Sequence, residues 1–467
     1  MPHSQNNMND IFLIEADKKI LSYRNGNDEP IWMYMRYNVM YNVVLKLFNN
    51  VQTVKKARAI SSKTAKYIIK AAGHNCLTGV RKKASPVAFY CPGDGFSKNG
   101  KYYNRFADQL RECLDTDSLL FENAALSWKW PESRSNNNVY YYAPAFTLQT
   151  IQSSPSSSDL EKTRELVDYV ADRIKVLYDA DLSERDKEDL VSETAREMVR
   201  CEKHAKWLLR QCKKKKISLL IMVGGSYSKY YAINRVLKKN GIRVADLQHG
   251  YITETNVVYN YNEALLDTED VKTATPEFFL TYGKWWGKRT NLPYKQIVEV
   301  GNPYRSYASS NYVRDKSNDI MIIGCARETA FYCSLADELG KRFKDRKVVF
   351  RPHPSERLTA ASVATDSGNF VIDNDRPIYT ALSESEVVIS EISTVLFEAI
   401  GLVKKIIVWS NDFSKYSLPE CPFATAESVE ELITAITEGP TDKNAGESDF
   451  WASNWEENFR SFVKTYV

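Results

Sequence analysis

Two segments decide the fold of the C-terminal half: Val348-Val349-Phe350-Arg351-Pro352-His353-Pro354 and Val387-Val388-Ile389-Ser390-Glu391-Ile392-Ser393-Thr394. Each begins with an apolar run typical of a strand buried on both faces and ends in a polar loop. In an open α/β sheet, ligands bind at the carboxyl ends of the strands. Both loops carry groups that suit an anion, so together they predict a site for a phosphorylated ligand.

The alternation of strands and helices extends toward the N-terminus as far as Ile217. Strands are expected at 217–223, 242–247, 278–281, 297–300 and 320–324, with helices over 230–240, 284–290 and 329–343. Such alternation predicts parallel sheets with helices on both faces. The two series separate near residues 301–317. The sequence therefore predicts an α/β protein with two similar domains facing each other, over residues 1–302 and 303–467.

The N-terminal half departs from this pattern in one long segment. Apolar residues at helical spacing predict a pair of amphipathic helices within residues 158–214, beginning at a capping box of Ser158 and Glu161. Nearer the N-terminus, a strand is expected at residues 10–14. The helical pair is interpreted as a structural layer against the sheet.

Composition sets limits on function. The chain has 467 residues, is 43% hydrophobic and 26% charged, and carries a net charge of +4, which does not demand a nucleic-acid partner. No secretory signal or membrane-spanning run is visible, and the eight cysteines show no metal or disulfide spacing. A cytoplasmic protein with reduced thiols is expected. The basic run 213–216 is either a solvated helix end or a contact for peripheral membrane association.

The two polar loops supply the candidate phosphate site. His353 lies between two prolines, which hold it on a stiff loop, and Arg351 can neutralise phosphate charge. Ser393 and Thr394 precede the apolar helical stretch 395–400 and fall at its N-cap or in its first turn, where hydroxyls and free N–H groups bind an anion. Glu398, one turn later, can accept bonds from ribose hydroxyls. The alternatives are a rigid turn for the histidine, simple capping for the hydroxyls and a surface position for the glutamate.

Two residues of the N-terminal half are candidate general bases. His249 ends a predicted strand and precedes Gly250, while Asp94 lies in the turn Pro92-Gly93-Asp94-Gly95. A structural role is the alternative for each. Nearby, Trp285 and Trp286 stand among basic residues, which fits sugar stacking or an interdomain surface. The chain has neither a DxD motif nor a His/Cys ligand cluster, so no required metal is predicted.

Taken together, these motifs resemble the GT-B glycosyltransferases of bacterial surface-polysaccharide synthesis, the enzymes that build capsule and lipopolysaccharide. The resemblance covers about residues 217–410 and rests on four motifs in the expected order: Gln248-His249-Gly250, Gly301-Asn302-Pro303, Arg351-Pro352-His353-Pro354, and Ser390-Glu391-Ile392-Ser393-Thr394 with Glu398-Ala399. It implies two Rossmann-like domains facing a cleft, the C-terminal one binding the donor nucleotide and the N-terminal one the acceptor.

The His-Pro and Ser/Thr motifs look like those of bacterial sialyltransferases and Kdo transferases, which use CMP-sugars. That likeness assigns nucleotide and phosphate contacts to His353, Ser393 and Thr394. The Gly93-Asp94-Gly95 turn is similar to the sialyltransferase motif whose aspartate is the base, although Gly93 replaces an acidic residue. A histidine-glycine pair with a later histidine also appears in teichoic-acid polymerases that use CDP-polyols, so that class of donor stays open. The two-glutamate signature of many retaining enzymes is not transferred, because the spacing of Glu391 and Glu398 differs from it.

The resemblance implies a metal-independent glycosyltransferase that moves a sugar from a nucleotide-activated donor, CMP-Kdo or CMP-sialic acid being favoured, to a hydroxyl of a glycan or lipid-linked glycan. The nucleotide-sugar is a substrate, and no further cofactor is expected. Three alternatives stay open: a CDP-polyol phosphotransferase, a UDP-sugar 2-epimerase, and a non-catalytic protein that binds glycan or acts as a scaffold.

Overall fold

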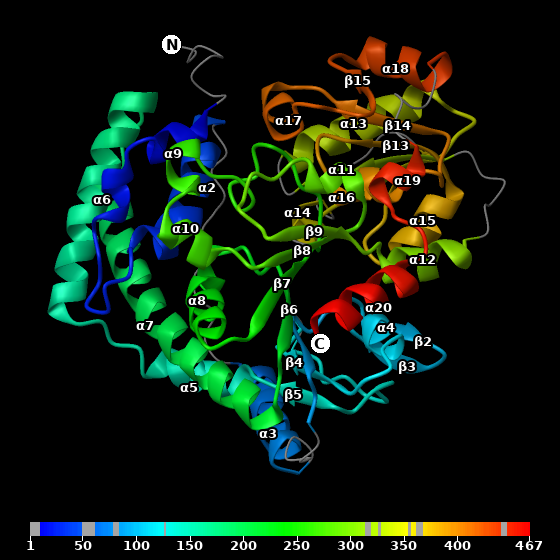
Figure 1. Ribbon diagram of the computed structural model, residues 1–467. Helices are drawn as coiled ribbons and strands as arrows, with labels where there is room; N and C mark the ends of the chain where they lie inside the picture. Colours follow the sequence, from blue (N-terminus) through cyan, green and yellow to red (C-terminus); the bar gives the residue numbers. More distant parts are fainter. Residues whose placement is uncertain are drawn as a thin grey trace.

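The chain folds around two separate parallel sheets (Figure 1). The computed structural model describes residues 10–48, 61–77, 84–125, 128–312, 319–325, 328–353, 356–360, 368–439 and 446–467. Pro354 of the predicted His-Pro loop lies outside these residues. Alternate residues of the central strands enter different hydrophobic cores, Ala88 and Tyr90 on one face and Val87 and Phe89 on the other. Both faces of the sheet are therefore covered, as in a Rossmann-like domain.

The first sheet has seven strands, and every pairing in it is parallel. Their spatial order is β5 (Val139–Tyr141), β4 (Ser118–Glu122), β1 (Val87–Cys91), β6 (Leu219–Val223), β7 (Arg243–Leu247), β8 (Phe278–Thr281) and β9 (Gln296–Glu299). Along the chain, β4 and β5 are added on one side of β1, and the later strands, from β6 to β9, extend the sheet on the other side. The carboxyl ends of β1 and β6 therefore flank the point where ligands bind in such sheets, and β7 is the next strand beyond β6.

The second sheet has six strands, again all parallel. Their order is β12 (Phe370–Ile372), β11 (Val348–Arg351), β10 (Asp319–Ile323), β13 (Ser385–Ser390), β14 (Lys405–Trp409) and β15 (Ala424–Ala426). Here the direction of strand addition reverses between β10 and β13. The predicted α/β fold with two Rossmann-like domains is confirmed, and its strands lie within two residues of those expected from Ile217 onward.

Helices and one hairpin complete the described chain. The hairpin is β2 (Gly95–Lys98) with β3 (Lys101–Asn104). The helices of the first half are η1 (Ile11–Glu15), η2 (Lys18–Leu21), α2 (Trp32–Leu47), α3 (Ser62–Leu77), α4 (Asp108–Glu112), α5 (Ala143–Ile151), α6 (Ser157–Tyr178), α7 (Glu184–Lys215), η3 (Ser228–Tyr230), α8 (Tyr231–Lys239), α9 (Glu263–Leu266), α10 (Glu269–Ala274) and α11 (Lys284–Gly287). Those of the second half are α12 (Pro303–Ser310), α13 (Thr329–Arg342), α14 (Arg357–Ala360), α15 (Ile378–Glu384), α16 (Thr394–Glu398), α17 (Asp412–Ser417), α18 (Val429–Thr437), α19 (Glu447–Phe450) and α20 (Trp455–Tyr466).

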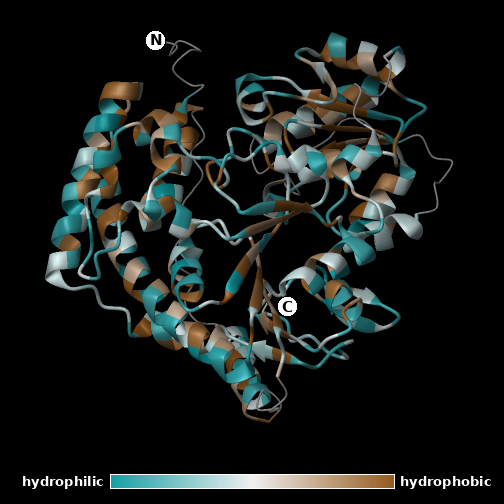
Figure 2. Ribbon diagram, viewed as in Figure 1, coloured by the Kyte–Doolittle hydropathy of each residue, from teal (hydrophilic) through white to brown (hydrophobic). Residues whose placement is uncertain are grey.

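The predicted helical pair is present as α6 and α7, which pack against each other and share a core with α2 and the first sheet. Many residues of the two helices are hydrophilic, whereas the central strands of the first sheet are largely hydrophobic (Figure 2). The expected capping box is wrong by two residues: Ser156, not Ser158, caps α6, because its hydroxyl accepts a bond from the Asp159 N–H at 3.0 Å. The strand expected at residues 10–14 is instead the 3-10 helix η1.

A hydrophobic core joins the two domains. Trp285 and Trp286 on α11 pack against Phe397 of α16 and Phe450 of α19, and the Trp286 indole N–H donates to the Phe450 carbonyl at 2.8 Å. Both tryptophans are buried, so this pair belongs to the interdomain contact rather than to a sugar-stacking surface. Burial of large aromatic side chains is a strong stabilising contribution.

The end of the chain returns to the first domain. The two sheets divide between β9 and β10, on either side of residue 302, but α20 packs on the first sheet. Phe462 lies 5.3 Å from Phe278 between ring centroids, and Phe459 lies 6.0 Å from Phe89. The segment 455–466 is thus a second covalent tie between the domains. Within the described residues, no helix is both long and apolar enough to cross a membrane.

A fully buried ion pair fixes the N-terminal segment to the first domain. Glu15 of η1 and Arg36 of α2 are 0% and 1% exposed as side chains. Glu15 also accepts the Trp32 indole N–H at 2.7 Å, and Arg36 donates to the carbonyls of Val257 and Asn260. The pair therefore ties η1 and α2 to the loop that follows β7.

Replacing Arg36 with Met should lower the free energy of unfolding by about 3–5 kcal/mol, because Glu15 then stays buried without a counter-charge. The measurement is urea denaturation followed by tryptophan fluorescence. The double variant Glu15→Gln, Arg36→Met leaves no buried charge and should be more stable than Arg36→Met alone. Equal stability of Arg36→Met and the parent chain would contradict this account.

Candidate active site between the two sheets

The loop after β7 carries the first candidate residue. Gln248 is fully buried and bonds on both sides of its amide: Nε2 donates to the Gly250 carbonyl at 2.8 Å, and Oε1 accepts the Tyr282 N–H at 2.7 Å. These bonds set the turn that presents His249. The His249 ring lies 5.7 Å from the Tyr227 ring, and its Nδ1 has no hydrogen-bond partner among the described residues.

The two domains meet directly beside His249. Thr394, after β13, accepts a hydrogen bond from the Tyr251 N–H through its Oγ1 at 3.4 Å. A Cβ at Gly250 would lie 3.5 Å from the same oxygen. The carboxyl end of β7 in one sheet therefore faces the carboxyl end of β13 in the other, as the sequence predicts for a cleft between two domains.

The helix after Ser393 is shorter than expected. The apolar stretch predicted from residue 395 to 400 forms only the five-residue α16, Thr394–Glu398. The Ser393 hydroxyl accepts the Val395 N–H at 3.2 Å and so caps this helix. Because the macrodipole grows with helix length, α16 contributes little field of its own. An anion here would depend on hydroxyls and on cations from other elements.

A small cavity lies at the domain junction and brings three predicted residues together. It has a volume of about 20 Å³ and is lined by Arg105, Phe106, His249, Tyr282, Asn302, Tyr304, Thr394 and Glu398. Burial raises the pKa of Glu398, while Arg105 and Arg305 oppose that rise. Such a volume holds about one water molecule. The cavity must therefore widen before a phosphate can enter it.

Asp94 approaches this cavity through Arg105. Its carboxylate is half exposed and lies 3.0 Å from Arg105 Nε. Below the turn, Asn104 donates to the Pro92 carbonyl at 2.8 Å and to the Glu122 carboxylate at 2.9 Å. Glu122 in turn forms a buried ion pair with Arg134 at 2.8 Å. This buried network holds the turn, and Asp94 with it, in a defined position.

The remaining candidates lie at the end of β11. Arg351 pairs with Asp373 at 2.8 Å and donates to the Arg376 carbonyl at 2.6 Å, so its charge is directed toward β12. His353 is exposed, and its backbone N–H donates to the Glu356 carboxylate at 2.9 Å. Since β10 separates β11 from β13, their ends are two strand spacings apart, about 10 Å. His353 and Thr394 can share a ligand only across the end of β10.

Gly324, at the end of β10, makes this close arrangement possible. A Cβ there would lie 2.5 Å from Glu356 Oε2 and 3.1 Å from the His353 nitrogen. Only glycine leaves that space open. Three short loops, after β10, β11 and β13, are therefore brought to one edge of the second sheet.

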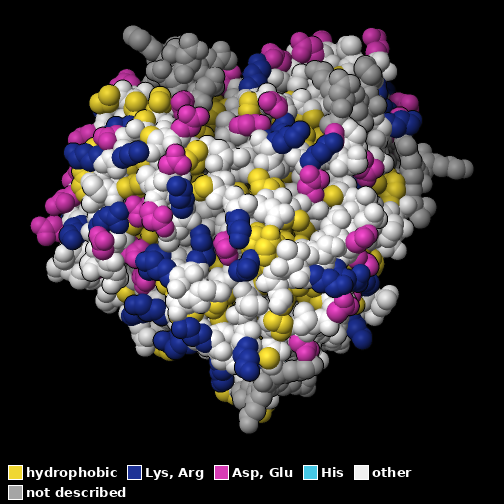
Figure 3. All heavy atoms as spheres, in the orientation of Figure 1, with side chains coloured by type: hydrophobic (Ala, Val, Ile, Leu, Met, Phe, Trp, Pro, Cys, Tyr) yellow, Lys and Arg dark blue, Asp and Glu magenta, His cyan; other side chains and the backbone are white. Residues whose placement is uncertain are grey.

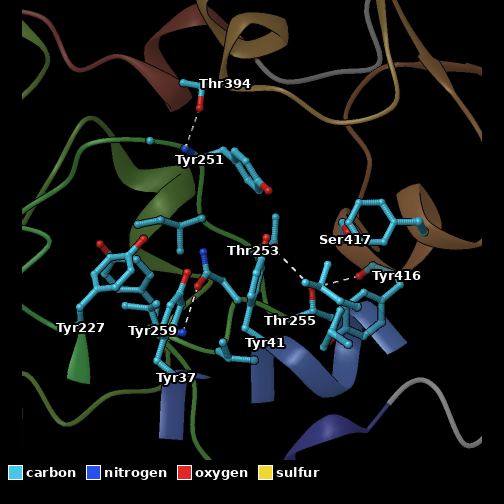
Figure 4. Close-up of a pocket in the computed structure, with 18 of the residues that line it drawn as sticks. Tyr37, Tyr41, Tyr227, Tyr251, Thr253, Thr255, Tyr259, Thr394, Tyr416 and Ser417 are labelled. Carbon is cyan, nitrogen blue, oxygen red and sulfur yellow. Dashed lines mark hydrogen bonds between the residues drawn. The ribbon is translucent and has the colours of Figure 1, made fainter. Parts of the chain in front are cut away.

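A second, larger cavity opens on the other side of His249 and Thr394 (Figure 4). We call it the tyrosine cavity; its volume is about 380 Å³. Its tyrosines are Tyr37 and Tyr41 from α2, Tyr227, Tyr251 and Tyr259 from loops of the first domain, and Tyr416 from α17. Both domains thus contribute to its wall.

Arg105 and these tyrosines are missing from the sequence prediction. Arg105 follows β3 in a segment without a recognisable motif, and the tyrosines come from segments far apart in the chain. The only local signal is that Tyr251 directly follows Gln248-His249-Gly250. Among the described residues, no group of three or more His, Cys, Asp or Glu side chains is arranged to hold a metal ion.

Comparison with known proteins finds solved structures that resemble this chain at low sequence identity. No family model matches it, and no curated protein does. A UDP-GlcNAc 2-epimerase from Neisseria meningitidis is 12% identical, with a TM-score of 0.45 over 81% of this chain and 98% of that one. The glycosyltransferase SnogD from Streptomyces nogalater is 10% identical, with a TM-score of 0.39 over 82% and 96%. Similarity as remote as this does not show what the chain does.

The His249 ring should remain neutral well below pH 6. Burial, together with a smaller effect of the nearby cations Lys229 and Arg105, lowers its pKa to about 4. The unfolded state then binds the proton more readily, so this histidine reduces stability as pH falls from about 6.5 toward 4. Histidine-selective NMR titration checks this, with His249→Gln identifying the resonance. A midpoint near 6.5 would show that the ring is not desolvated.

Proposed function

We propose that the protein is a glycosyltransferase that uses a nucleotide-activated sugar. The observation that carries the proposal is the meeting of His249 and Thr394, from the facing ends of β7 and β13, between two cavities of different character. One cavity is polar, with the Arg105 guanidinium and the Glu398 carboxyl group in its wall. The other is aromatic and hydroxyl-rich. A charged donor on one side and a sugar acceptor on the other is the arrangement that glycosyl transfer requires.

The tyrosine cavity favours a transferase over an epimerase. A 2-epimerase acts on one nucleotide-sugar and needs no second substrate site. A transferase must hold an acceptor hydroxyl against the anomeric carbon of the donor, because correct placement of two reactants supplies much of the rate. The tyrosine cavity, adjoining His249, has the size of a small-molecule site.

In the proposed reaction, neutral His249 accepts the proton of the acceptor hydroxyl. The oxygen attacks the anomeric carbon, the bond from that carbon to the phosphate oxygen breaks, and the nucleotide leaves as an anion. The Thr394 hydroxyl and the Arg105 guanidinium are placed to stabilise that charge. Asp94, which lines neither cavity among the described residues, is assigned to hold Arg105.

A CMP-sugar is the favoured donor because of the motifs around His353, Ser393 and Thr394. Their strand ends are about 10 Å apart, so a ligand longer than a phosphate is needed to contact both. A nucleoside monophosphate has that length. Glu398 is placed to accept a hydrogen bond from a hydroxyl of the donor.

Nucleotide binding should raise the thermal stability of the purified protein, because a ligand that binds only the native state stabilises it, by about 2.7 kcal/mol at one hundred times the Kd. We expect CMP to act most strongly among CMP, CDP, UMP, UDP and GDP. Thr394→Val and His353→Ala should each reduce the shift, and the exposed Thr437→Val serves as the matched control. A shift with CDP alone points to polyol-phosphate transfer. No shift with any nucleotide would favour a non-catalytic glycan-binding protein.

The two candidate bases should differ in their kinetic effect. His249→Gln should lower kcat by about 10²- to 10⁴-fold, since general-base catalysis accelerates a reaction by about that factor. The same variant should leave the donor KM nearly unchanged. Asp94→Asn should have a smaller effect on kcat and raise the donor KM by loosening Arg105. Steady-state rates with a CMP-sugar donor give both values. A larger loss of kcat in Asp94→Asn than in His249→Gln would make Asp94 the base.

The acceptor side also bears a surface suited to a membrane. The helices α3, α5 and the end of α7 pack side by side, and residues 62–77, 143–151 and 203–216 contain no Asp or Glu. Lys and Arg side chains gather over the C-terminal part of α7, at the lower left of the view, with few acidic neighbours (Figure 3). Among the aliphatic side chains, Ile69 is 71% exposed, Leu77 86% and Ile151 71%. Exposed apolar side chains among lysines fit the surface of an anionic bilayer.

The protein should therefore sediment with vesicles that contain phosphatidylglycerol and not with pure phosphatidylcholine. Each surface lysine contributes about 1 kcal/mol to such binding. The charge-reversed variant of the exposed Lys213, Lys214 and Lys216, and separately Ile69→Ser with Leu77→Ser, should reduce the bound fraction severalfold. Charge reversal of Lys344, on the second domain, is the control. Undiminished binding of both variants would exclude this surface.

A further inference from the structure

The tyrosine cavity lacks ionised side chains. Among the described residues that line it there is no Asp, Glu, Lys or Arg. Its one histidine, His249, is neutral near pH 7 because burial lowers its pKa to about 4. Burial also raises the pKa of Tyr37 to about 12, so the phenols keep their protons. A phosphate or carboxylate entering this cavity would lose its hydration without gaining a counter-charge, which is costly.

The wall nevertheless offers unmet hydrogen-bonding groups. Tyr259 and Tyr416 are buried, and neither hydroxyl has a partner among the described residues. The same holds for Nδ1 of His249 at the junction with the smaller cavity. Leaving such a group unsatisfied costs about 1–3 kcal/mol. These atoms have almost no accessible surface, so a ligand that brings several hydroxyls satisfies them once the tyrosine rings turn toward the cavity.

The shape of the wall suits a ring. Tyr37 and Tyr41 lie on one face of α2 with their rings stacked, 5.6 Å apart and inclined by 11°. Across the cavity, Tyr416 and Ser417 of α17 form the opposite side, and the segment that carries Tyr251 and Thr253 lies between (Figure 4). Aromatic faces cover an apolar surface, and the Tyr and Thr hydroxyls bond to polar groups at its edge. A pyranose presents both.

We propose that the tyrosine cavity is the acceptor subsite and that it takes an uncharged, hydroxylated sugar ring. This inference rests on the proposed transferase function and deepens it by naming the acceptor class. The ring stacks on the Tyr37 and Tyr41 wall, bonds to the hydroxyls of Tyr259 and Tyr416, and directs one hydroxyl toward His249. Uronic acids, sialic acids and phosphorylated sugars are excluded from this position by the uncharged wall.

Saturation-transfer-difference NMR on the full chain, without nucleotide, tests the proposal. The probes are methyl β-glucoside and methyl N-acetyl-β-glucosaminide, compared with methyl β-glucuronide. The neutral glycosides should give signals, and the glucuronide should bind at least fivefold more weakly. Tyr259→Phe and Tyr416→Phe remove only a hydroxyl and should each weaken glycoside binding by about five- to tenfold, the loss of one hydrogen bond. Tyr332→Phe, buried in the second domain, is the control.

Three results would overturn the proposal: no binding of either neutral glycoside, equal binding of the glucuronide, or unchanged binding in both Phe variants. A fourth is displacement of the glycosides by cytidine, which would make the cavity the site of the donor base. The nucleotide test is independent. Glycoside binding without any nucleotide effect would leave a sugar site and remove the transferase, whereas the reverse would keep the transferase and remove this acceptor assignment.

Discussion

The burial of Trp286 against Phe397 and Phe450 is the contact on which the site depends. Each Rossmann-like domain can form its own sheet, but the cleft exists only if the two sheets hold a fixed relative position. The aromatic core between α11, α16 and α19 supplies that constraint, and α20 adds a second tie by packing on the first sheet. Thr394 is the first residue of α16, so the residue that meets the first domain belongs to a helix that this aromatic core holds in place.

Desolvation then sets the chemistry on each side of the junction. Burial keeps His249 neutral and favours the protonated forms of Glu398 and of the tyrosines. Charge is confined to the Arg105 side, where Asp94 anchors the guanidinium. The smaller cavity is therefore polar and the tyrosine cavity uncharged, and the imidazole of His249 lies where the two cavities meet. Such a boundary separates a charged leaving group from a neutral nucleophile, which is what transfer between two substrates needs.

The N-terminal segment takes part in this arrangement at a distance. The buried Glu15–Arg36 pair binds α2 to the loop after β7, and α2 provides Tyr37 and Tyr41. The helical pair α6 and α7 supports α2 from outside. A segment with no sequence motif thereby builds one wall of the tyrosine cavity, and the layer that the sequence shows only as structural has a role in shaping it.

The sequence by itself determined the strands, the parallel sheets and the division into two domains, because apolar runs of buried strands and the 3.6-residue period of helices are local signals. It also proposed His249 and Thr394, which follow the ends of strands, where turn residues are visible in the sequence, and Glu398, which lies one helical turn after Thr394. Only the tertiary structure decided that these three line one cavity while Arg351 pairs with Asp373. Arg105 and the six tyrosines could not be predicted, because they converge from separate elements and share no spacing in the chain. Which distant residues come together, and which side chains lose contact with water, depends on how the elements pack. A pattern along the sequence does not contain that information.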